Sequence, residues 1–315
     1  MGTKRNVEIQ RPEKVLFPND GSDGGDVGND SDGSDGDGSD GGITKADLAE
    51  HYRAVAPLML PQLRGRPIMM ERHPDGIGGK PLMQKNAPDY FPDWVRRAVL
   101  PKEGGKVTHV VCDNRATLLY LADQACVTPH RWLSRADRPD HPDVLVFDLD
   151  PPGEGDFEAV RWAARRVCEL LDTVRLPTRL MTTGSRGLHV LAPLDRQSDF
   201  DSVRAFARDV AEELERRHPD RLTTAARKAD RGDRLYLDTQ RNGYAQTAVS
   251  PYAVRARPGA PVAVPIAAAE LDDPELRPDR WTLRTVGERL ESDPWSGTPF
   301  RGRSLRAAAA RLGRV

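Results

Sequence analysis

The stretch Val144-Leu145-Val146-Phe147-Asp148-Leu149-Asp150-Pro151-Pro152 decides both the fold and the chemistry of this chain. Its apolar run predicts a buried β-strand over 144–149 that ends in two carboxylates. Successive side chains of a strand alternate between faces, so Asp148 and Asp150 project on the same side. Two acidic side chains aimed at one place suit a hard divalent cation such as Mg²⁺ or Mn²⁺ in a phosphoryl-transfer site. The alternative is a pair of solvated acids at a strand edge, and this motif alone does not separate the two.

The composition describes a globular chain of one large or two small domains. It has 315 residues, of which 38% are hydrophobic and 30% are charged. No long apolar run and no apolar signal core after Met1 are present, so we expect no membrane span and a cytoplasmic location. Cys112, Cys126 and Cys168 lack Cys-x-x-Cys spacing, which argues against a zinc site or a disulfide framework. We expect these cysteines to be core or inert thiols.

An acidic insert over 19–42 separates the N-terminal segment from the rest of the chain. It holds eight aspartates and no basic residue, and what remains has 47 basic residues against 40 of the original 48 acidic ones. A basic body fits a polyanionic ligand. The insert has too few apolar residues to offset the entropy of ordering, so disorder is expected. A tether, a docking tail and a mimic of nucleic-acid charge that autoinhibits the body all remain open for it. Its aspartates match no EF-hand or nonapeptide calcium template.

The order of predicted elements is mixed, which indicates an α/β (α+β) fold. Thr44 is expected to cap a helix, with Asp47 completing a capping box. Residues 257–302 are rich in Pro, Arg and Asp and are expected to wrap the surface. Strands are predicted at 106–113, 144–149, 180–183, 188–191 and 234–238, and further helices at 116–125, 157–171, 202–217 and 304–312.

A second motif, Thr182-Thr183-Gly184-Ser185-Arg186-Gly187-Leu188-His189-Val190, collects phosphate-binding groups in one turn. Glycines let backbone N–H groups approach an anion, and arginine offers a planar fork for phosphate oxygens. Neither a Walker loop nor a dinucleotide fingerprint is present. The alternative is a hairpin turn with an exposed arginine and a structural histidine.

A third motif begins with Arg234-Leu235-Tyr236-Leu237-Asp238, another strand that ends in an acid. Asp238 could complete a metal site with the first two aspartates. Arg255, further along the chain, could reach a triphosphate as a permanently charged bidentate donor. Taken singly, Asp238 could equally be a turn acid and Arg255 a solvated edge residue. Their occurrence together with the first two motifs favours the functional interpretation.

Through these three motifs together, the chain resembles the polymerase domain of bacterial ligase D, in the archaeo-eukaryotic primase superfamily. The resemblance runs through 11–18, 148–151, 185–189 and 251–259, in that order. It implies a primase-like fold with mixed central β-sheets flanked by helices. It also implies a template-directed nucleotidyltransferase that extends or fills DNA ends and gaps in non-homologous end joining at the nucleoid. The expected division is an end-binding segment at 1–18, the acidic insert at 19–42, a catalytic body at 43–302 and a C-terminal helix at 303–315.

The resemblance also assigns roles to individual residues. Two divalent ions, Mn²⁺ or Mg²⁺, would be held by Asp148, Asp150 and Asp238. The incoming NTP or dNTP would contact Ser185, Arg186, His189, Arg231, Arg255 and His130. The 5′-phosphate across a gap would contact Lys14 and Lys45, and the template would contact Leu82, Met83 and Lys85. His130 precedes Trp132 in a segment where a lone histidine is otherwise more often structural.

Several positions depart from the family pattern. Leu82-Met83 stands where relatives have two adjacent phenylalanines, which would weaken base stacking. Arg186 stands where Lys is usual, Arg241 replaces a Gln, and Arg11-Pro12 replaces a polar residue ahead of Lys14. These changes bear on template choice and end binding more than on the chemical step.

Other activities remain possible for the same residues. The alternatives are a primer-independent primase, a catalytically silent DNA-end-binding module and a metal-dependent nuclease, although a nuclease has no use for a triphosphate pocket. No Lys-x-Asp-Gly ligase motif is present, so we expect a stand-alone polymerase unit. A separate DNA ligase and a Ku-like end-binding protein are the partners that the resemblance implies.

Overall fold

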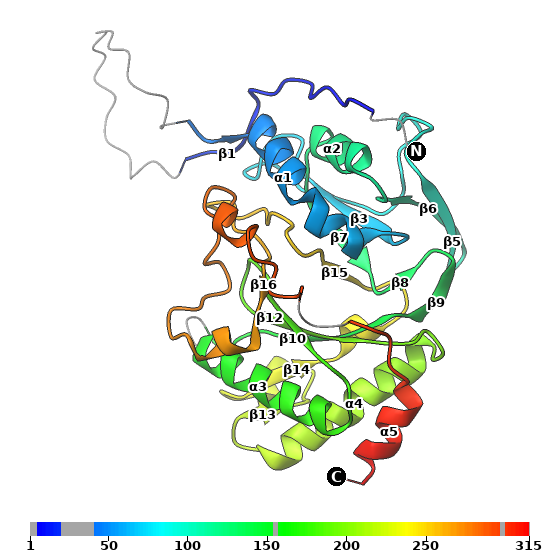
Figure 1. Ribbon diagram of the computed structural model, residues 1–315, viewed down its shortest axis with the longest axis vertical. Helices are drawn as coiled ribbons and strands as arrows, with labels where there is room; N and C mark the ends of the chain where they lie inside the picture. The colour runs from blue at the N-terminus through cyan, green and yellow to red at the C-terminus, as the bar shows by residue number, and fades with distance from the viewer. Residues whose placement is uncertain (1–4, 20–40, 154–156, 297–299, 315) are drawn as a thin grey trace.

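The chain folds into two β-sheets with helices packed on both, as described by a computed structural model for residues 5–19, 41–153, 157–296 and 300–314. Within these ranges the strands form two six-stranded sheets and two short ribbons, accompanied by five α-helices (Figure 1). The predicted α/β (α+β) class is therefore confirmed. The predicted acidic insert lies, for residues 20–40, outside the described residues.

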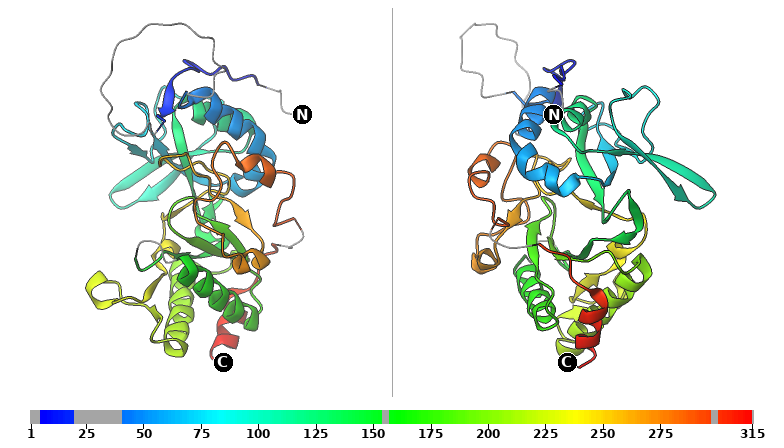
Figure 2. Two further views of the ribbon diagram at one scale, coloured as in Figure 1. Left: turned by 90° about the vertical axis from the view of Figure 1, so that its left-hand side faces the viewer. Right: turned by 45° about the vertical axis from the view of Figure 1, so that its right-hand side comes forward.

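The first sheet is built from the N-terminal half of the chain and one later strand. Its strand order is β15-β7-β3-β6-β5, with β4 paired to β3. Helices α1 and α2 pack against each other beside this sheet, and the β5–β6 hairpin projects from the body (Figure 2). The strands are β3 (Pro67–Arg72), β4 (Leu82–Gln84), β5 (Arg97–Lys102), β6 (Gly105–Val111), β7 (Cys126–Trp132) and β15 (Thr247–Val249), and the helices are α1 (Lys45–Leu63) and α2 (Arg115–Asp123).

The second sheet carries the acidic strand of the first motif at its centre. Its order is β13-β14-β10-β12-β11-β16. Helices α3 and α4 cover one of its faces and α5 lies beside α4 (Figure 1). The strands are β10 (Val144–Leu149), β11 (Arg179–Thr182), β12 (Leu188–Pro193), β13 (Leu222–Thr223), β14 (Leu235–Asp238) and β16 (Pro265–Ile266), and the helices are α3 (Phe157–Thr173), α4 (Phe200–Arg217) and α5 (Leu305–Leu312).

Two antiparallel ribbons lie outside the sheets. The first joins β1 (Val15–Phe17) to β2 (Ile43–Thr44), and the second joins β8 (Ser134–Arg135) to β9 (Arg138–Pro142). Short 3₁₀ helices occupy the loops, at η1 (Lys228–Asp230), η2 (Gln240–Asn242), η3 (Ala268–Asp272) and η4 (Val286–Arg289).

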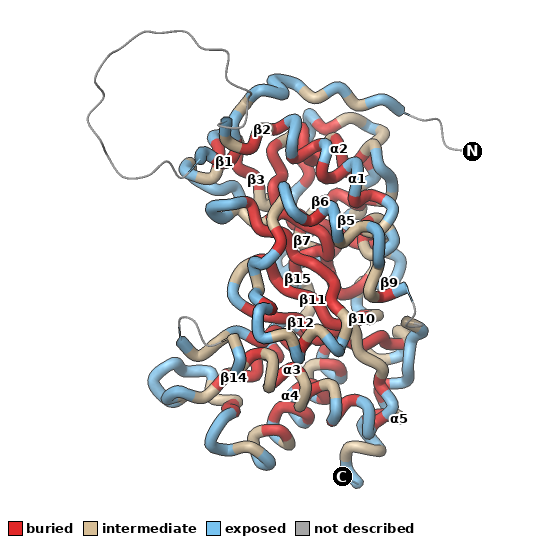
Figure 3. The backbone as a smooth tube through the Cα atoms, turned by 60° about the vertical axis from the view of Figure 1, so that its left-hand side comes forward, coloured by how far each residue is buried: buried red, intermediate tan, exposed pale blue. Residues whose placement is uncertain are grey.

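One continuous apolar core joins the two sheets. All six residues of β10 are buried, because the strand lies between β14 and β12 and beneath the α3 and α4 helices. Figure 3 shows the buried band running from α1 and β3 through β7 and β15 to β10 and β12. All three cysteines are free: Cys112 and Cys126 are buried in the core, and Cys168 is partly buried against it. Burial raises the pKa of Cys126 to about 12 and that of Cys168 to about 11, so these thiols are protonated at neutral pH.

Most predicted elements are present at nearly the predicted bounds. The capping box is confirmed: the Thr44 hydroxyl accepts from the Asp47 N–H at 3.2 Å, and Asp47 Oδ2 accepts from the Thr44 N–H at 2.7 Å. The prediction that 257–302 only wraps the surface is wrong in part. Pro265–Ile266 forms the edge strand β16, and Val262 and Val264 are fully buried, because this segment fills the open side of β11.

Candidate active site

The register of three neighbouring strands brings the acids of the first and third motifs together. On β10, Asp148 lies directly opposite Asp238 of β14 on one side and opposite His189 of β12 on the other. Residues opposite each other in antiparallel strands share a face of the sheet. A row of two carboxylates and one imidazole therefore crosses the sheet at this point.

Asp148 and Asp150 also line two adjoining cavities, of about 110 and 450 Å³. The shared lining agrees with the expectation that the two side chains project on one side of their strand. The smaller cavity also contains the predicted residues His130, Ser185, His189 and Arg255. The larger one also contains the predicted residues Arg186, Arg231 and Asp238.

The carboxylate of Asp148 is buried and bound on both oxygens. Arg241 Nε donates to Oδ2 at 2.9 Å, and His189 Nε2 lies 3.4 Å from Oδ1. Burial alone would raise the pKa of Asp148, but the neighbouring His189 and Arg241 outweigh it and hold the pKa well below its usual range. Asp148 is therefore ionised at neutral pH.

Asp150 is shifted in the opposite direction. Its pKa is raised, first by desolvation of its carboxyl group and then by the negative charge of Asp148. A cation between the two acids would relieve this repulsion. Three hard carboxylate donors fit a divalent ion such as Mg²⁺ or Mn²⁺ by their chemistry. As arranged, however, no three His, Cys, Asp or Glu side chains among the described residues are grouped closely enough to enclose a metal, and Arg241 holds one oxygen of Asp148.

The turn between β11 and β12 is shaped by its two glycines. Gly184 has a φ of +62°, a conformation that favours glycine. A Cβ on Gly187 would lie 2.0 Å from the Leu149 carbonyl oxygen and 2.6 Å from Asp150 Oδ1. The absence of a side chain at Gly187 thus lets the turn approach the end of β10. The Ser185 hydroxyl lies at the cavity wall and accepts from Arg257 Nη1 at 2.5 Å.

Two buried polar atoms of the smaller cavity lack a hydrogen-bond partner among the described residues. They are His189 Nδ1 and Arg255 Nε. Arg255 Nη1 is fixed by the Thr183 carbonyl oxygen at 2.7 Å. Buried donors and acceptors are nearly always paired in folded proteins. Unpaired buried atoms of this kind also occur elsewhere among the described residues, so the case for a ligand site rests on the cavity lining and its charges.

His130 is oriented by an acid on the neighbouring strand. Its Nε2–H donates to Glu71 Oε2 at 2.9 Å, and Glu71 Oε1 lies 3.4 Å from His73 Nε2. Burial lowers the pKa of His130 although Glu71 opposes the shift, so the ring is neutral at pH 7. A neutral ring held in this way leaves Nδ1 as an acceptor.

The arginines of the larger cavity are held by different contacts. Arg231 lies 3.9 Å from the ring centroid of Tyr236 and donates through Nε to the Ala225 carbonyl oxygen at 3.0 Å. Arg186 contributes positive charge that opposes the raised pKa of Asp150. Both arginines lie on the same cavity wall as the carboxylates.

The predicted DNA-contact residues lie outside both cavities. Lys14 and Lys45 are joined by a backbone hydrogen bond of 2.8 Å at the β1–β2 ribbon. Lys45 is only 5% exposed, and its Nζ is 3.3 Å from Asp123 Oδ1. By contrast, Lys14 Nζ is more exposed and lies 3.8 Å from Asp75.

The predicted template residues are exposed on β4. Leu82 is 44% exposed and Met83 is 57% exposed, and Lys85 follows them on the surface. Met83 lies opposite Glu71 on β3, which binds His130, so an exposed apolar side chain shares the face of the sheet that leads to the smaller cavity.

Three contributors to the site were missed by the sequence motifs. Glu71 lies in a strand that was not predicted, Arg257 appeared only as part of a longer match, and the direct contact of Arg241 with Asp148 was not foreseen. For Glu71 no sequence signal was available. Arg241 could have been found from its position three residues after Asp238, where η2 turns the chain back toward β10.

Comparison with known proteins gives a consistent result. Residues 44–295 match the model of the LigD primase-polymerase domain. The multifunctional non-homologous end joining DNA repair protein LigD of Mycobacterium tuberculosis is 35% identical over 284 residues, which are 87% of this chain and 34% of that protein. The bifunctional LigD of Bacillus subtilis is 30% identical over 258 residues, 82% of this chain and 41% of that protein. The chain thus spans about a third of the length of the first of these relatives.

The fold agrees with this relationship. A solved structure, the polymerase domain of Mycobacterium tuberculosis ligase D in complex with DNA, superposes with a TM-score of 0.80 at 30% identity, covering 92% of this chain and 96% of that one. The predicted primase-like architecture is confirmed by this match. None of the helices in the described part of the chain is long and apolar enough to cross a bilayer.

Proposed function

The chain belongs to the LigD primase-polymerase family, and on that premise we propose that it is a template-directed nucleotidyltransferase that extends or fills DNA ends and gaps in non-homologous end joining. The observation that carries the proposal is the register of β10 with β14 and β12. It sets Asp238, Asp148 and His189 side by side, with Asp148 in the lining of both cavities, His189 in that of the smaller one and Asp238 in that of the larger one.

Asp148, Asp150 and Asp238 would hold the divalent ions, Mn²⁺ or Mg²⁺, which lower the pKa of a primer 3′-hydroxyl and neutralise the triphosphate. The raised pKa of Asp150 beside the ionised Asp148 supports this assignment, since a site with unrelieved carboxylate repulsion favours a cation. The protein's own contribution is to keep both acids on one face, through the pairing of β10.

The incoming nucleotide would lie against the turn between β11 and β12. Arg255 offers a guanidinium, His189 an imidazole and Ser185 a hydroxyl at the smaller cavity, and Arg186 offers a further guanidinium at the larger one. Arginine forks suit phosphate oxygens because they donate two parallel hydrogen bonds. His130 and Arg231 complete the walls on either side.

DNA would lie across the first sheet. The relative solved with DNA has the same fold, and the exposed Leu82 and Met83 give an apolar surface for a template base. Lys14 would supply a point charge for a downstream 5′-phosphate. A separate ligase, a Ku-like end binder and a place at the nucleoid stay predictions.

A gap-filling assay tests the proposal. A labelled primer-template with a phosphorylated or unphosphorylated downstream strand is supplied with Mn²⁺ and either ribo- or deoxynucleotides, beside an Asp148→Ala control. We expect incorporation that the control lacks and that improves with the 5′-phosphate. Incorporation that ignores the phosphate, together with dinucleotide synthesis on single strands, would favour a primer-independent primase. No incorporation by a folded, DNA-binding protein would favour a silent end-binding module.

A further inference from the structure

A third cavity, of about 620 Å³, lies between the two sheets and away from the acids. It is lined by Val144 and Pro193, where β10 begins and β12 ends. Asp148 and His189 lie four residues away along these strands, roughly 13 Å at 3.3 Å per residue. The cavity is therefore separate from the candidate active site.

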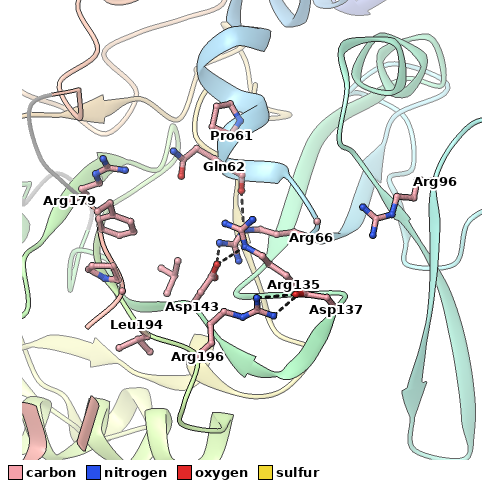
Figure 4. A pocket seen from close by; sticks show the side chains of 15 residues that line it. Pro61, Gln62, Arg66, Arg96, Arg135, Asp137, Asp143, Arg179, Leu194 and Arg196 are labelled. Atoms are coloured by element: carbon pink, nitrogen blue, oxygen red, sulfur yellow. Dashed lines mark hydrogen bonds and ion pairs between the residues drawn. The ribbon is translucent and has the colours of Figure 1, made fainter. Parts of the chain in front are cut away.

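Arginine dominates the walls of this cavity (Figure 4). Its guanidinium groups come from five separate segments of the chain, at Arg66, Arg96, Arg135, Arg179 and Arg196. The acids among the lining residues that the structure describes are Asp137 and Asp143. The described lining carries three more positive than negative side chains. Arg96 pairs with Asp113 just outside the lining, which leaves an excess of two, and a concave surface of mostly one sign attracts anions.

The base of the cavity is fixed by a buried pair. Arg66 is 3% exposed, and its Nη2 lies 2.6 Å from Asp143 Oδ1, while Arg135 Nε donates to Asp143 Oδ2 at 2.8 Å. The Arg66 Nε and Nη1 groups donate to the carbonyl oxygens of Gln62 and Trp132. These contacts fix the positions of Arg66 and Arg135, and the two arginines share the carboxylate of Asp143.

At the rim of the cavity, Arg196 and Asp137 form an ion pair in which another anion could replace the carboxylate. The Arg196 guanidinium donates two parallel hydrogen bonds to the Asp137 carboxylate, from Nη1 to Oδ2 at 3.0 Å and from Nη2 to Oδ1 at 2.7 Å. The side chain of Asp137 is 64% exposed, so water can replace it at little cost. Two parallel bonds from a guanidinium to two oxygens are also the geometry in which arginine binds a phosphate group.

We propose that this arginine-lined cavity binds a phosphate-bearing anion of nucleotide size, with the phosphate taking the place of Asp137 on Arg196. The volume lies within the range of small-molecule sites, roughly 300–1,000 Å³. The phosphate can come from a free nucleotide or from the end of a nucleic-acid strand, since both present the same group. The site does not depend on the polymerase activity proposed above, because it shares no residue with the two acidic cavities.

A purely structural role for the arginines makes a different prediction about the rim pair. If Arg196 and Asp137 only tie two loops together, removing either one loses the same contact, and neither change alters anion binding. If the cavity binds a phosphate, Arg196→Gln removes a ligand-binding group, whereas Asp137→Asn removes the competing acid and frees the fork. The two substitutions then act in opposite directions.

The test is calorimetric titration of the full chain with tripolyphosphate, with ATP and with a short 5′-phosphorylated single strand. Hydrogen exchange locates the binding, since a ligand here protects Ser134–Pro142 and a ligand at the active site protects the turn at 183–187. We expect protection of Ser134–Pro142, an affinity about tenfold weaker in Arg196→Gln, and a tighter affinity in Asp137→Asn. Among the probes that protect this segment, the one with the highest affinity shows whether the phosphate comes from a free nucleotide or from the end of a nucleic-acid strand.

Arg138→Gln is the matched control, because this exposed arginine lies in the same ribbon outside the lining. It should leave the affinity unchanged. Melting temperatures confirm that all three variants are folded. The proposal is overturned if no probe protects Ser134–Pro142 in the parent protein, or if the two rim substitutions change the affinity in the same direction or not at all. A failed gap-filling assay has no bearing on either result.

Discussion

Arg241 Nε lies 2.9 Å from Asp148 Oδ2, so a cationic side chain of this chain occupies an oxygen of the acid at the centre of the candidate metal site. The contact joins η2, which follows β14, to the C-terminal end of β10. It satisfies one oxygen of a buried carboxylate whose other oxygen faces His189. Any cation that binds Asp148 through this oxygen must first displace the guanidinium.

Replacing Arg241 with Gln should therefore strengthen metal binding. The variant removes a competing positive charge, and we expect the dissociation constant for Mn²⁺ to fall about tenfold. Titration of free Mn²⁺ by electron paramagnetic resonance measures this without nucleotide or DNA. Arg204→Gln is the control, because Arg204 contacts the neighbouring Gln240 instead of the acid. An unchanged or weaker affinity in Arg241→Gln would show that the arginine does not compete with metal.

Gly187→Ala should damage both the fold and the site. A new Cβ would lie 2.0 Å from a backbone oxygen of β10 and 2.6 Å from the Asp150 carboxylate. We expect a loss of about 1–3 kcal/mol in the free energy of unfolding, measured with urea, together with weaker Mn²⁺ binding. Gly287→Ala has no atom within 4 Å of the added carbon and should change neither quantity. Parent-like stability in Gly187→Ala would contradict the close approach of the turn to β10.

The two lysines near the β1–β2 ribbon should behave differently. Lys45→Gln leaves the buried Asp123 without its cation and should cost about 3 kcal/mol of stability. Lys14→Gln should cost less than about 1 kcal/mol, because its pair with Asp75 is exposed.

We expect Lys14→Gln nonetheless to abolish the preference for a gapped DNA with a 5′-phosphate, measured by fluorescence anisotropy. A retained preference in this stable variant would remove Lys14 from the phosphate contact. Loss of the preference in Lys45→Gln alone would not count, since that variant is destabilised.

Met83→Ser should weaken template binding without affecting stability. The side chain is 57% exposed, so its loss should change the free energy of unfolding by no more than about 0.5 kcal/mol. Anisotropy with a primer-template should show a lower affinity, and Met83→Phe should show a higher one through base stacking. Val99→Ser, at a residue 59% exposed on β5, is the control. Equal effects at positions 83 and 99 would speak against a template contact on β4.

His51 should make the protein less stable in mild acid. It is buried on α1 with Nε2 at 2.9 Å from the Tyr252 carbonyl oxygen, and burial lowers its pKa from 6.5 to about 4 despite that hydrogen bond. As the pH falls, His51 is therefore protonated in the unfolded chain before it is protonated in the folded protein. The contribution of neutral His51 to the free energy of unfolding is fully present above pH 6.5. It is lost as the pH falls from 6.5 to about 4 and does not change further below that value.

This shift corresponds to about 2 kcal/mol of stability between pH 7 and pH 5. Urea unfolding at the two pH values measures it. His51→Gln keeps an N–H donor but does not titrate, so its loss of stability over the same range should be smaller by that amount. Equal losses in the two proteins would show that His51 does not titrate as its burial implies.

Four of the six strands of the second sheet were predicted from the sequence (β10, β11, β12 and β14), but only β6 of the six strands of the first. The strand 144–149 is a continuous apolar run, and Thr44 with Asp47 has the pattern of a capping box, so local rules were sufficient. β3 and β7 carry Arg72 and Arg131 at buried positions. Their guanidinium groups are satisfied by partners distant in sequence, including the Gln124 and Gln62 carbonyl oxygens, which no local pattern reveals.

The candidate site shows the same division. Residues that follow an apolar strand or lie in a glycine turn, such as Asp148 and Ser185, were identified from short motifs. Glu71 and the Arg241 contact depend on which strands become neighbours. Strand order is set by packing across the whole core, so these contributors could only be recognised once β3 was seen beside β7 and β10 beside β14.

The β1–β2 ribbon has a consequence for how this chain tolerates change. Phe17 and Ile43 are paired across it, so the chain leaves the body and returns to it at adjacent points. The entropy of closing a loop grows only with the logarithm of its length. Changes in the length of chain between these two residues should therefore cost the rest of the fold little, as long as β1 and β2 stay paired. An insertion at this junction thus leaves the strands that carry the acids in place.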